Sequence, residues 1–419
     1  MKLKINHIFH LLLVCLLSVL FNLYVHVAEP ANSMVNYVNK NHPNTENLIV
    51  TDGFLPWAVD YHQTLPDFKK RPFTSFLVEN VAVFFSVRIS IAFVWVNYFF
   101  LFCSGFLIYF LAKLYLLSHP KALGSVIFFY FSFSILLAYF IPIATYDEPI
   151  QYFLILLSLF FLKKGYKLLF AIIFSFAVIS RESSLILLPG IALFLFGIDF
   201  KNILKDKKVF LKNVLMLSIP VVIYLAYLYF FYDNNPEILK ETKEVLAKKY
   251  QIYQRNFRNL KEVSRTLLSF YSVIIFPIFL LFLNSKYYQF IKIDNRLLKA
   301  FWLTFLLNSI VIFITVYAEE SRVFTLPFLL LFPIFGEILL KSNSLKFFYY
   351  LLDFKKVGLV VLTTLLSWFV FNYLYAFTGF EMKDNYYVEY NVVIIFLMIV
   401  VGYKAKFLKS LTQNSFNPR

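Results

Sequence analysis

Glycine, proline, cysteine and charge are all scarce in this chain of 419 residues, which holds 10 Gly, 15 Pro, 2 Cys and only 15% charged residues. The low glycine and proline content excludes collagen-like repeats and low-complexity linkers. Cys15 and Cys103 both lie in apolar segments and provide neither a disulfide framework nor metal-ligand spacing. A Walker motif, a GxSxG motif and His-rich zinc spacing are absent too, so the chain has no recognisable route to ATP hydrolysis.

Apolar residues take the place of what is missing, because 60% of the chain is hydrophobic and 21% is aromatic. Runs of about 18 or more apolar residues recur along the whole length, which is typical of transmembrane helices. The sequence therefore predicts an all-α polytopic membrane protein that forms a single integral membrane domain, 1–419, with about twelve spans. The predicted spans are 7–28, 90–117, 122–143, 149–162, 168–181, 184–198, 209–232, 266–285, 298–317, 323–340, 357–379 and 390–403.

The formal net charge is +16, and the basic residues are scattered through short loops. The positive-inside rule explains this pattern better than a nucleic-acid partner does, and it predicts that both termini are cytoplasmic. Most Asp and Glu residues fall in the loops on the other side. Because acids contribute little to membrane topology, this bias indicates that the outer face carries the chemistry.

Two outer regions are long. The first outer loop, 29–89, contains Asp52 and Asp60 and ends in "TSFLVENVAVFFSVRIS", whose pattern predicts an amphipathic helix on the membrane surface before the next span. The second, 233–265, is a charged helical segment with spaced opposite charges. For any single acid of the first loop, a solvated turn is the simpler explanation.

A short outer turn, "TYDEPIQYF", places Asp147 and Glu148 side by side between two apolar runs. Pro149 suits the first turn of a helix, and Asp147 or Thr145 could cap that helix. Helix capping explains one acid, but it explains a second adjacent acid less well. Ionisable groups near membrane depth are costly and often functional, so the pair is a candidate for part of an active site.

Two further charge clusters interrupt apolar sequence. Arg181 and Glu182 lie in "VISRESSLILLPG", where an ion pair between short helices is the structural alternative. Glu319, Glu320 and Arg322 open "EESRVFTLPFLLLFP", where an interfacial charge cluster is the alternative. Arginine is well suited to bidentate binding of a phosphate.

The order of these motifs resembles that of the GT-C superfamily of polytopic glycosyltransferases, in the bacterial branches similar to protein mannosyltransferases and lipid A aminoarabinose transferases. The resemblance covers roughly 1–200 in order, through "RPFTSFL", "TYDEPIQYF" and "ISRESSLILLP", and the rest more weakly. "YAEESRVF" is similar to the family's His-Lys-Glu-x-Arg-Phe segment, but it has Tyr317 and Ala318 in place of His-Lys. The family's first-loop acid usually lies nearer the first helix, where this chain has Glu29.

The resemblance implies a GT-C-like fold in a bacterial cytoplasmic membrane. It also implies transfer of a sugar from a polyprenyl-phosphate donor to a glycan, lipid or protein acceptor at the outer face. The resemblance implies that Asp52, or Asp60 as the second choice, is the general base and that Asp147 and Glu148 line the cleft. It also implies that the donor phosphate is bound by Arg181, Arg322 and Arg71. Supporting residues would be Glu182, Glu319 and Glu320. Whether a divalent cation takes part stays open. A polysaccharide polymerase or ligase is the alternative enzyme, and a lipid or solute transporter is the non-enzymatic alternative.

Overall fold

The structure, a computed structural model, describes residues 4–27, 50–139, 145–196, 207–240, 250–287, 295–339, 353–379 and 386–416. Within these ranges every regular element is helical and no strand is present, which confirms the all-α fold class. In chain order the α-helices are α1 (Ile5–Val27), α3 (Val50–Thr64), α4 (Pro66–Lys69), α5 (Phe73–Phe85), α6 (Ile89–Leu114), α7 (His119–Tyr130), α8 (Phe133–Leu136), α9 (Glu148–Lys163), α10 (Lys167–Ser180), α11 (Leu187–Phe196), α13 (Lys207–Asp233), α15 (Tyr250–Phe257), α16 (Leu260–Tyr287), α17 (Asn295–Thr315), α18 (Phe332–Leu339), α20 (Phe354–Thr378) and α21 (Tyr387–Phe416). Three 3₁₀ segments lie among them: η2 (Glu182–Ile186), η3 (Ser321–Phe324) and η4 (Leu326–Leu330).

Seven of the described helices are long and apolar enough to cross a bilayer, namely α1, α6, α13, α16, α17, α20 and α21. They confirm a polytopic membrane protein, although the sequence predicts about twelve spans. The other predicted spans fall on shorter pieces. Helices α7, α9, α10 and α11 have 12, 16, 14 and 10 residues, and the predicted span 323–340 is divided among η3, η4 and α18. A hydropathy window averages over the turns between these short helices, so it does not reveal where one ends and the next begins.

These short helices form the centre of the bundle. Helix α9 packs between α6 and α10, α7 packs against α18, and α11 packs against α17. Two glycines allow this close approach. A Cβ at Gly336 would lie 1.9 Å from the carbonyl oxygen of Lys121, and a Cβ at Gly190 would lie 2.7 Å from the carbonyl oxygen of Ala300. The helices therefore meet backbone to backbone, as helices with small interface residues do in membranes.

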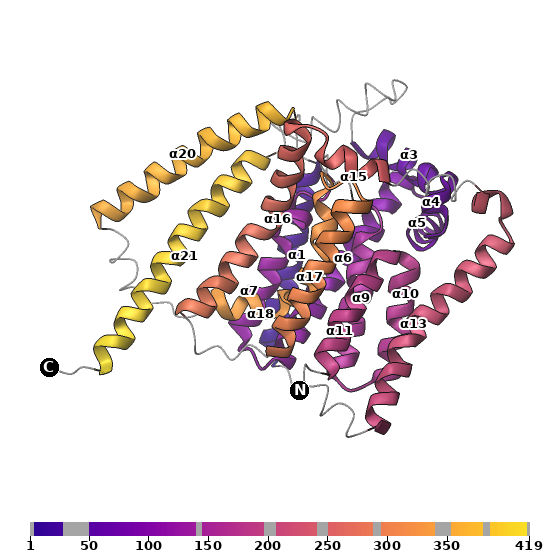
Figure 1. The fold of residues 1–419 in the computed structure, drawn as a ribbon, viewed down its shortest axis with the longest axis horizontal. Coiled ribbons are helices and arrows are strands. Elements are labelled where there is room, and N and C mark those ends of the chain that lie inside the picture. Colours follow the sequence, from indigo (N-terminus) through magenta and orange to yellow (C-terminus); the bar gives the residue numbers. More distant parts are fainter. Residues whose placement is uncertain are drawn as a thin grey trace.

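One end of the bundle carries α3, α4, α5 and α15 (Figure 1). The predicted surface helix within 74–90 is confirmed as a helix, α5, which stops where Ser86 adopts a left-handed φ of 53°. Phe76 and Phe84 on α5 are exposed, which suits a helix that rests on a membrane surface. The part of the first outer loop at 28–49 lies outside the described residues.

The second predicted outer segment, 233–265, is helical where it is described. Helix α15 and the first turns of α16 fall within it, and 241–249 lies outside the described residues. Helix α15 packs against both α16 and α17. The charged residues of α15 and of the first turns of α16 are therefore held close to these long helices.

Three helices stand at the periphery. Figure 1 shows α20 and α21 on one flank of the bundle and α13 on the other. Only 6% of the apolar window in α20 and 17% of that in α13 are buried in the protein. Their exposed side chains include Leu225, Phe230, Leu362 and Phe369. Apolar surface of this extent is typical of helices that face lipid.

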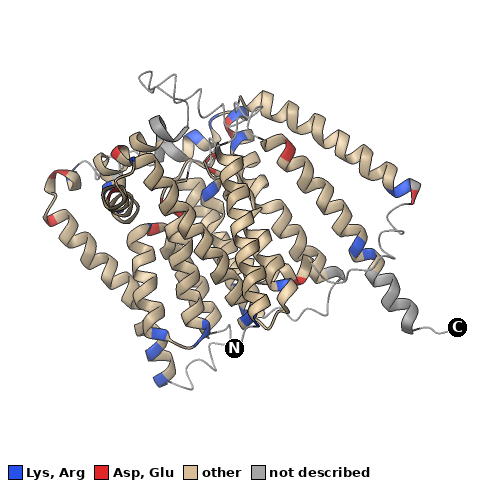
Figure 2. Ribbon diagram, turned by 180° about the vertical axis from the view of Figure 1, so that it is seen from behind, with Lys and Arg blue, Asp and Glu red and all other residues tan. Residues whose placement is uncertain are grey.

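Charged side chains gather at the two ends of the helices (Figure 2). The end that carries α3, α5 and α15 has both acids and bases, whereas the opposite end has mostly Lys and Arg. This is the distribution that the positive-inside rule requires if that opposite end faces the cytoplasm.

Candidate functional site

The acid pair at the start of α9 does not act as a helix cap. Asp147 occupies the N-cap position of α9, but its side chain makes no capping hydrogen bond. Its Oδ1 instead accepts a hydrogen bond of 2.7 Å from the hydroxyl of Thr74 on α5. Glu148 Oε2 accepts hydrogen bonds from the Thr145 hydroxyl at 2.7 Å and from the Tyr146 N–H at 2.9 Å. The capping explanation is therefore wrong for both acids.

Glu148 joins three segments that are far apart in the sequence. Its Oε1 pairs with Nη1 of Arg181, which precedes η2, and with Nε of Arg322 in η3 at 2.8 Å. The Glu148 side chain is 5% exposed. Arg322 also donates from Nη2 to Glu320 at 2.8 Å. One buried carboxylate thus fixes two guanidinium groups in the same place.

A third arginine is fixed by a second carboxylate. Arg71, which follows α4, donates from Nε and Nη2 to the two oxygens of Glu182 at 2.9 and 2.7 Å. Lys70 lies 3.5 Å from the same carboxylate. Arg71 Nη1 is also 3.9 Å from Oδ2 of Asp147. The end of the first outer loop is therefore attached to η2 and to the start of α9.

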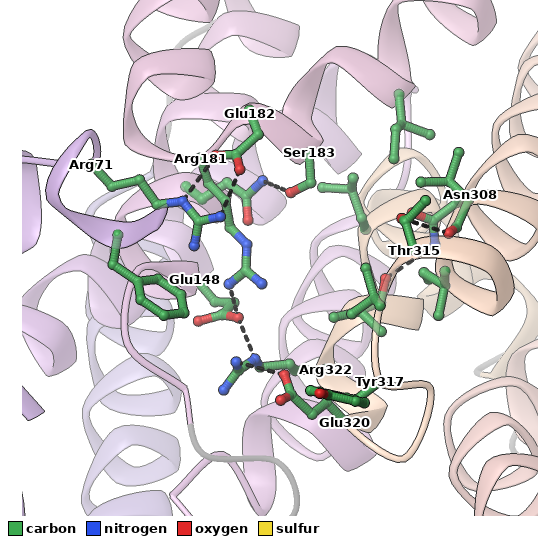
Figure 3. Close-up of a pocket in the computed structure, with 18 of the residues that line it drawn as sticks. Arg71, Glu148, Arg181, Glu182, Ser183, Asn308, Thr315, Tyr317, Glu320 and Arg322 are labelled. Atoms are coloured by element: carbon green, nitrogen blue, oxygen red, sulfur yellow. Dashed lines mark hydrogen bonds and ion pairs between the residues drawn. The ribbon is translucent and has the colours of Figure 1, made fainter. Parts of the chain in front are cut away.

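These groups face a single large cavity of about 1590 Å³. Figure 3 shows the arginines and glutamates on one side of it and Asn308 and Thr315 of α17 on the other. Among the described residues, six basic and three acidic side chains line it: Lys70, Arg71, Arg181, Arg255, Arg258 and Arg322 against Glu148, Glu182 and Glu320. The rest of the lining is mostly aromatic and aliphatic. The cavity therefore favours an anionic group attached to an apolar or ring-shaped one.

The two paired glutamates are held in their charged form. Burial alone would raise the pKa of Glu148, but the charges of Arg181 and Arg322 outweigh it and hold the pKa well below its usual range. Burial likewise acts against ionisation of Glu182, and Arg71 holds the pKa of that carboxyl well below its usual range. Neither glutamate is suited to accept a proton at neutral pH.

Asp147 has the opposite balance. Its side chain is 1% exposed, and burial raises its pKa to about 6, although Arg71 and the hydrogen bond from Thr74 oppose the shift. Its Oδ2 has no hydrogen-bond partner among the described residues. A carboxylate with a pKa near neutral is suited to exchange protons at physiological pH.

The structure brings seven of the predicted site residues together: Arg71, Asp147, Glu148, Arg181, Glu182, Glu320 and Arg322. Asp147 is not part of the lining, but its Oδ2 lies 3.9 Å from Nη1 of Arg71, which is. Glu319 is directed elsewhere, 3.3 Å from Arg255 and 3.8 Å from Arg265. Asp60 is exposed on α3 and does not line the cavity. Asp52 falls in the first turn of α3, but its side chain lies outside the described part of the structure.

Sequence analysis missed several cavity residues that adjoin the predicted ones. Lys70 precedes Arg71, and Ser183 follows Glu182. Gln151 lies one turn after the acid pair on α9, and its amide donates to the hydroxyls of Ser183 and Ser184 at 3.0 and 2.9 Å. Helical spacing from Asp147 points to Gln151, but nothing in the sequence indicates the serines that it contacts.

The cavity carboxylates are each paired with arginine, which leaves little charge for a cation. Among the described residues no group of three or more His, Cys, Asp or Glu side chains is arranged to hold a metal ion. Comparisons with protein-family models, curated protein sequences and solved structures give no match. The function therefore has to be inferred from the site itself.

Proposed function

We propose that this chain is a GT-C-type glycosyltransferase that takes a sugar from a polyprenyl-phosphate donor and transfers it to a hydroxyl group of a glycan, lipid or protein. The observation that carries the proposal is the convergence of Arg71, Arg181 and Arg322 on one cavity. They come from three separate parts of the chain, and a carboxylate fixes each of them: Glu182 for Arg71, and the buried Glu148 for Arg181 and Arg322. Such fixed guanidinium groups suit a phosphate.

Phosphate is also where negative charge develops during sugar transfer. When the bond between the anomeric carbon and the phosphate oxygen breaks, its electron pair stays on the phosphate. Cations that are already in place stabilise that charge without reorganising at the moment of reaction. Arg181 and Arg322 share the carboxylate of Glu148, and Arg322 also pairs with Glu320. Basic side chains still outnumber acidic ones among the described lining residues, so the lining keeps a net positive charge.

An apolar wall supports a lipid-linked donor. Val311 and Ile312 of α17 line the cavity. Val311 is 38% exposed on a helix long and apolar enough to span the bilayer. A donor with its phosphate at the arginines would have its prenyl chain along this wall, where apolar contact is favourable. We place the site at the outer face of a bacterial cytoplasmic membrane, because the basic loops lie at the opposite end.

Purified protein in lipid nanodiscs tests the proposal with a panel of polyprenyl-phosphate sugars and a panel of glycan, lipid and protein acceptors. Arg322→Gln removes a proposed phosphate ligand, and Arg88→Gln is the matched control. Arg88 is exposed at the start of α6 and does not line the cavity. We expect Arg322→Gln to lower transfer by about 100-fold or more and Arg88→Gln to leave it unchanged.

Arg181→Lys, which keeps the charge but loses the fork geometry, separates a role in phosphate binding from a folding defect. We expect intermediate transfer from this variant, at normal yield and thermal stability. Absence of transfer with every donor would contradict the proposal. Lipid or solute movement in liposomes would then favour a transporter, and addition of preassembled glycan blocks would favour a polymerase or ligase.

A further inference from the structure

We propose that His62 and Asp147 form a proton relay that accepts the proton of the acceptor hydroxyl. The inference rests on the proposed glycosyl transfer and assigns its general base, which neither glutamate of the cavity suits. The pair lies behind the arginine cluster, where α3 of the first outer loop meets the start of α9.

Each of the two side chains has one polar atom without a hydrogen-bond partner among the described residues, and these two atoms lie near each other. Nδ1 of His62 lies 3.9 Å from Oδ2 of Asp147. Both atoms are buried, and neither has a hydrogen-bond partner among the described residues. Buried polar atoms are rarely left unpaired. A closing of about 1 Å would make a hydrogen bond between them, and catalytic hydrogen bonds are often long before substrate binds.

Neighbouring groups hold the histidine ring in place. The His62 ring stacks on Tyr146 with centroids 3.5 Å apart and planes 14° apart. Phe68 contacts the ring with centroids 4.5 Å apart. Phe68 and Tyr61, whose rings both contact the His62 ring, line the cavity, so His62 lies next to the cavity lining without being part of it. Because Nδ1 is buried, the 12% exposure of the side chain falls on the rest of it, where Nε2 is the only other polar atom.

Asp147 is fixed from its other oxygen. Oδ1 accepts the hydrogen bond from Thr74 on α5, which leaves Oδ2 near both His62 Nδ1 and Arg71 Nη1, 3.9 Å from each. The pair therefore has the order that a relay needs: Nε2 on the far edge of a ring that is 12% exposed, a buried Nδ1 and a buried carboxylate behind it. In a general-base dyad, the carboxylate fixes the tautomer that carries its proton on Nδ1.

Surrounding charge decides where the proton comes to rest. Burial, and then the positive charges of the arginines, lower the pKa of His62 to about 3, so an imidazolium is disfavoured. Burial raises the pKa of Asp147 to about 6. The proton therefore passes through a neutral imidazole and rests on the carboxyl group. The charged and titratable groups that face the pair from neighbouring elements are Arg71, Tyr146, Glu148, Arg181 and Arg322.

The acceptor O–H gives its proton to Nε2 of His62, while the proton on Nδ1 moves to Oδ2 of Asp147. The electron pair of the acceptor oxygen forms the new bond to the anomeric carbon. The bond from that carbon to the phosphate oxygen breaks, and its electrons leave on the phosphate beside the arginines. Asp147 later returns the proton through His62 to water or to the released phosphate.

A pH–rate series of the transfer reaction tests the relay with His62→Gln and Asp147→Asn. His10→Gln is the matched control, because His10 is exposed on α1 and does not line the cavity. Loss of general-base catalysis typically costs about 100-fold to 10,000-fold. We expect both relay variants to lose kcat on that scale with the donor KM unchanged. We also expect the wild-type acid limb, with a midpoint near the pKa of Asp147 of about 6, to vanish from the residual rate. A loss of less than about threefold, or an acid limb that persists, would overturn the relay.

A spectroscopic measurement tests the pair without any substrate. We expect an infrared band of a protonated carboxyl group that titrates near pH 6 in the wild type, is absent from Asp147→Asn and shifts in His62→Gln. A band that does not change in His62→Gln would overturn the pairing, even if transfer is observed. If the band shifts in His62→Gln but the wild type transfers no sugar, both the proposed function and the relay are overturned. Normal transfer in both variants would overturn the relay alone.

Discussion

Glu148 has an unusual position among the residues of the site, because one carboxylate balances two guanidinium groups. Removing one partner of a buried ion pair typically costs about 3–5 kcal/mol, because the other charge stays buried and uncompensated. The hydrogen bonds from Thr145 and Tyr146 would also lose a charged acceptor. Glu148 is therefore a positioning residue for the arginines rather than a base.

The first prediction concerns this carboxylate. Glu148→Gln should lower the free energy of unfolding by about 3–5 kcal/mol, as measured by thermal unfolding in detergent. Adding inorganic phosphate should restore part of the loss, because a bound anion replaces the missing charge. The control is Glu389→Gln, since Glu389 is exposed on α21 and far along the chain from the site. Equal stability of the two variants would contradict the role given to Glu148.

The second prediction concerns pH. Burial raises the folded-state pKa of Asp147 to about 6, above the ordinary value of 3.8. Between these values Asp147 keeps its proton in the folded protein but has released it in the unfolded chain. The contribution of Asp147 to the free energy of unfolding therefore falls as the pH rises from about 4 to 6. The shift corresponds to about 3 kcal/mol. Relative to the wild type, Asp147→Asn should gain up to that amount between pH 4 and pH 7 in detergent unfolding measurements. A constant difference would exclude the raised pKa.

Close backbone contact determines how the short central helices pack. The third prediction is that Gly336→Ala disrupts the contact between α18 and α7, because its Cβ would meet the Lys121 carbonyl oxygen at 1.9 Å. Overpacking of this kind costs about 1–3 kcal/mol or more. Gly358→Ala is the control, because a Cβ there meets nothing within 4 Å, and alanine in a helix is favoured by about 1 kcal/mol. In thermal unfolding, Gly336→Ala should destabilise the protein and Gly358→Ala should stabilise it. Similar effects of the two substitutions would show that the close approach is unimportant.

The sequence allowed most of the elements and several site residues to be predicted, but not which charges pair. Arg181 and Glu182 are adjacent, yet they turn to different partners: Arg181 to Glu148 and Glu182 to Arg71. Neighbouring residues point in different directions at the junction of α10 and η2, so proximity in sequence does not predict an ion pair there. Hydropathy also predicted one continuous span at 323–340, where the structure has three pieces, because the turns between η3, η4 and α18 keep an apolar composition.

In the described part of the molecule, one end carries both acids and bases, whereas the opposite end carries mostly Lys and Arg (Figure 2). The fourth prediction is that the site end faces outward. In intact cells, a membrane-impermeant thiol reagent should label Asp60→Cys, whereas Lys208→Cys should react only after permeabilisation. Both positions are exposed, and of the native cysteines Cys15 is buried and Cys103 partly so. The reverse labelling pattern would show that the proposed membrane orientation is wrong.

The double pairing of Glu148 also bears on biosynthesis. Glu148 and Arg181 are made early, whereas Arg322 belongs to the last third of the chain. Chains fold from the N-terminus while they are being synthesised, so Glu148 meets Arg181 first. The cavity cannot acquire its final shape until the ribosome has passed residue 322 and η3 has been delivered to the bundle. A nascent chain stalled before that point would hold an incomplete form of the proposed phosphate site, so the order of synthesis would delay the appearance of the proposed activity.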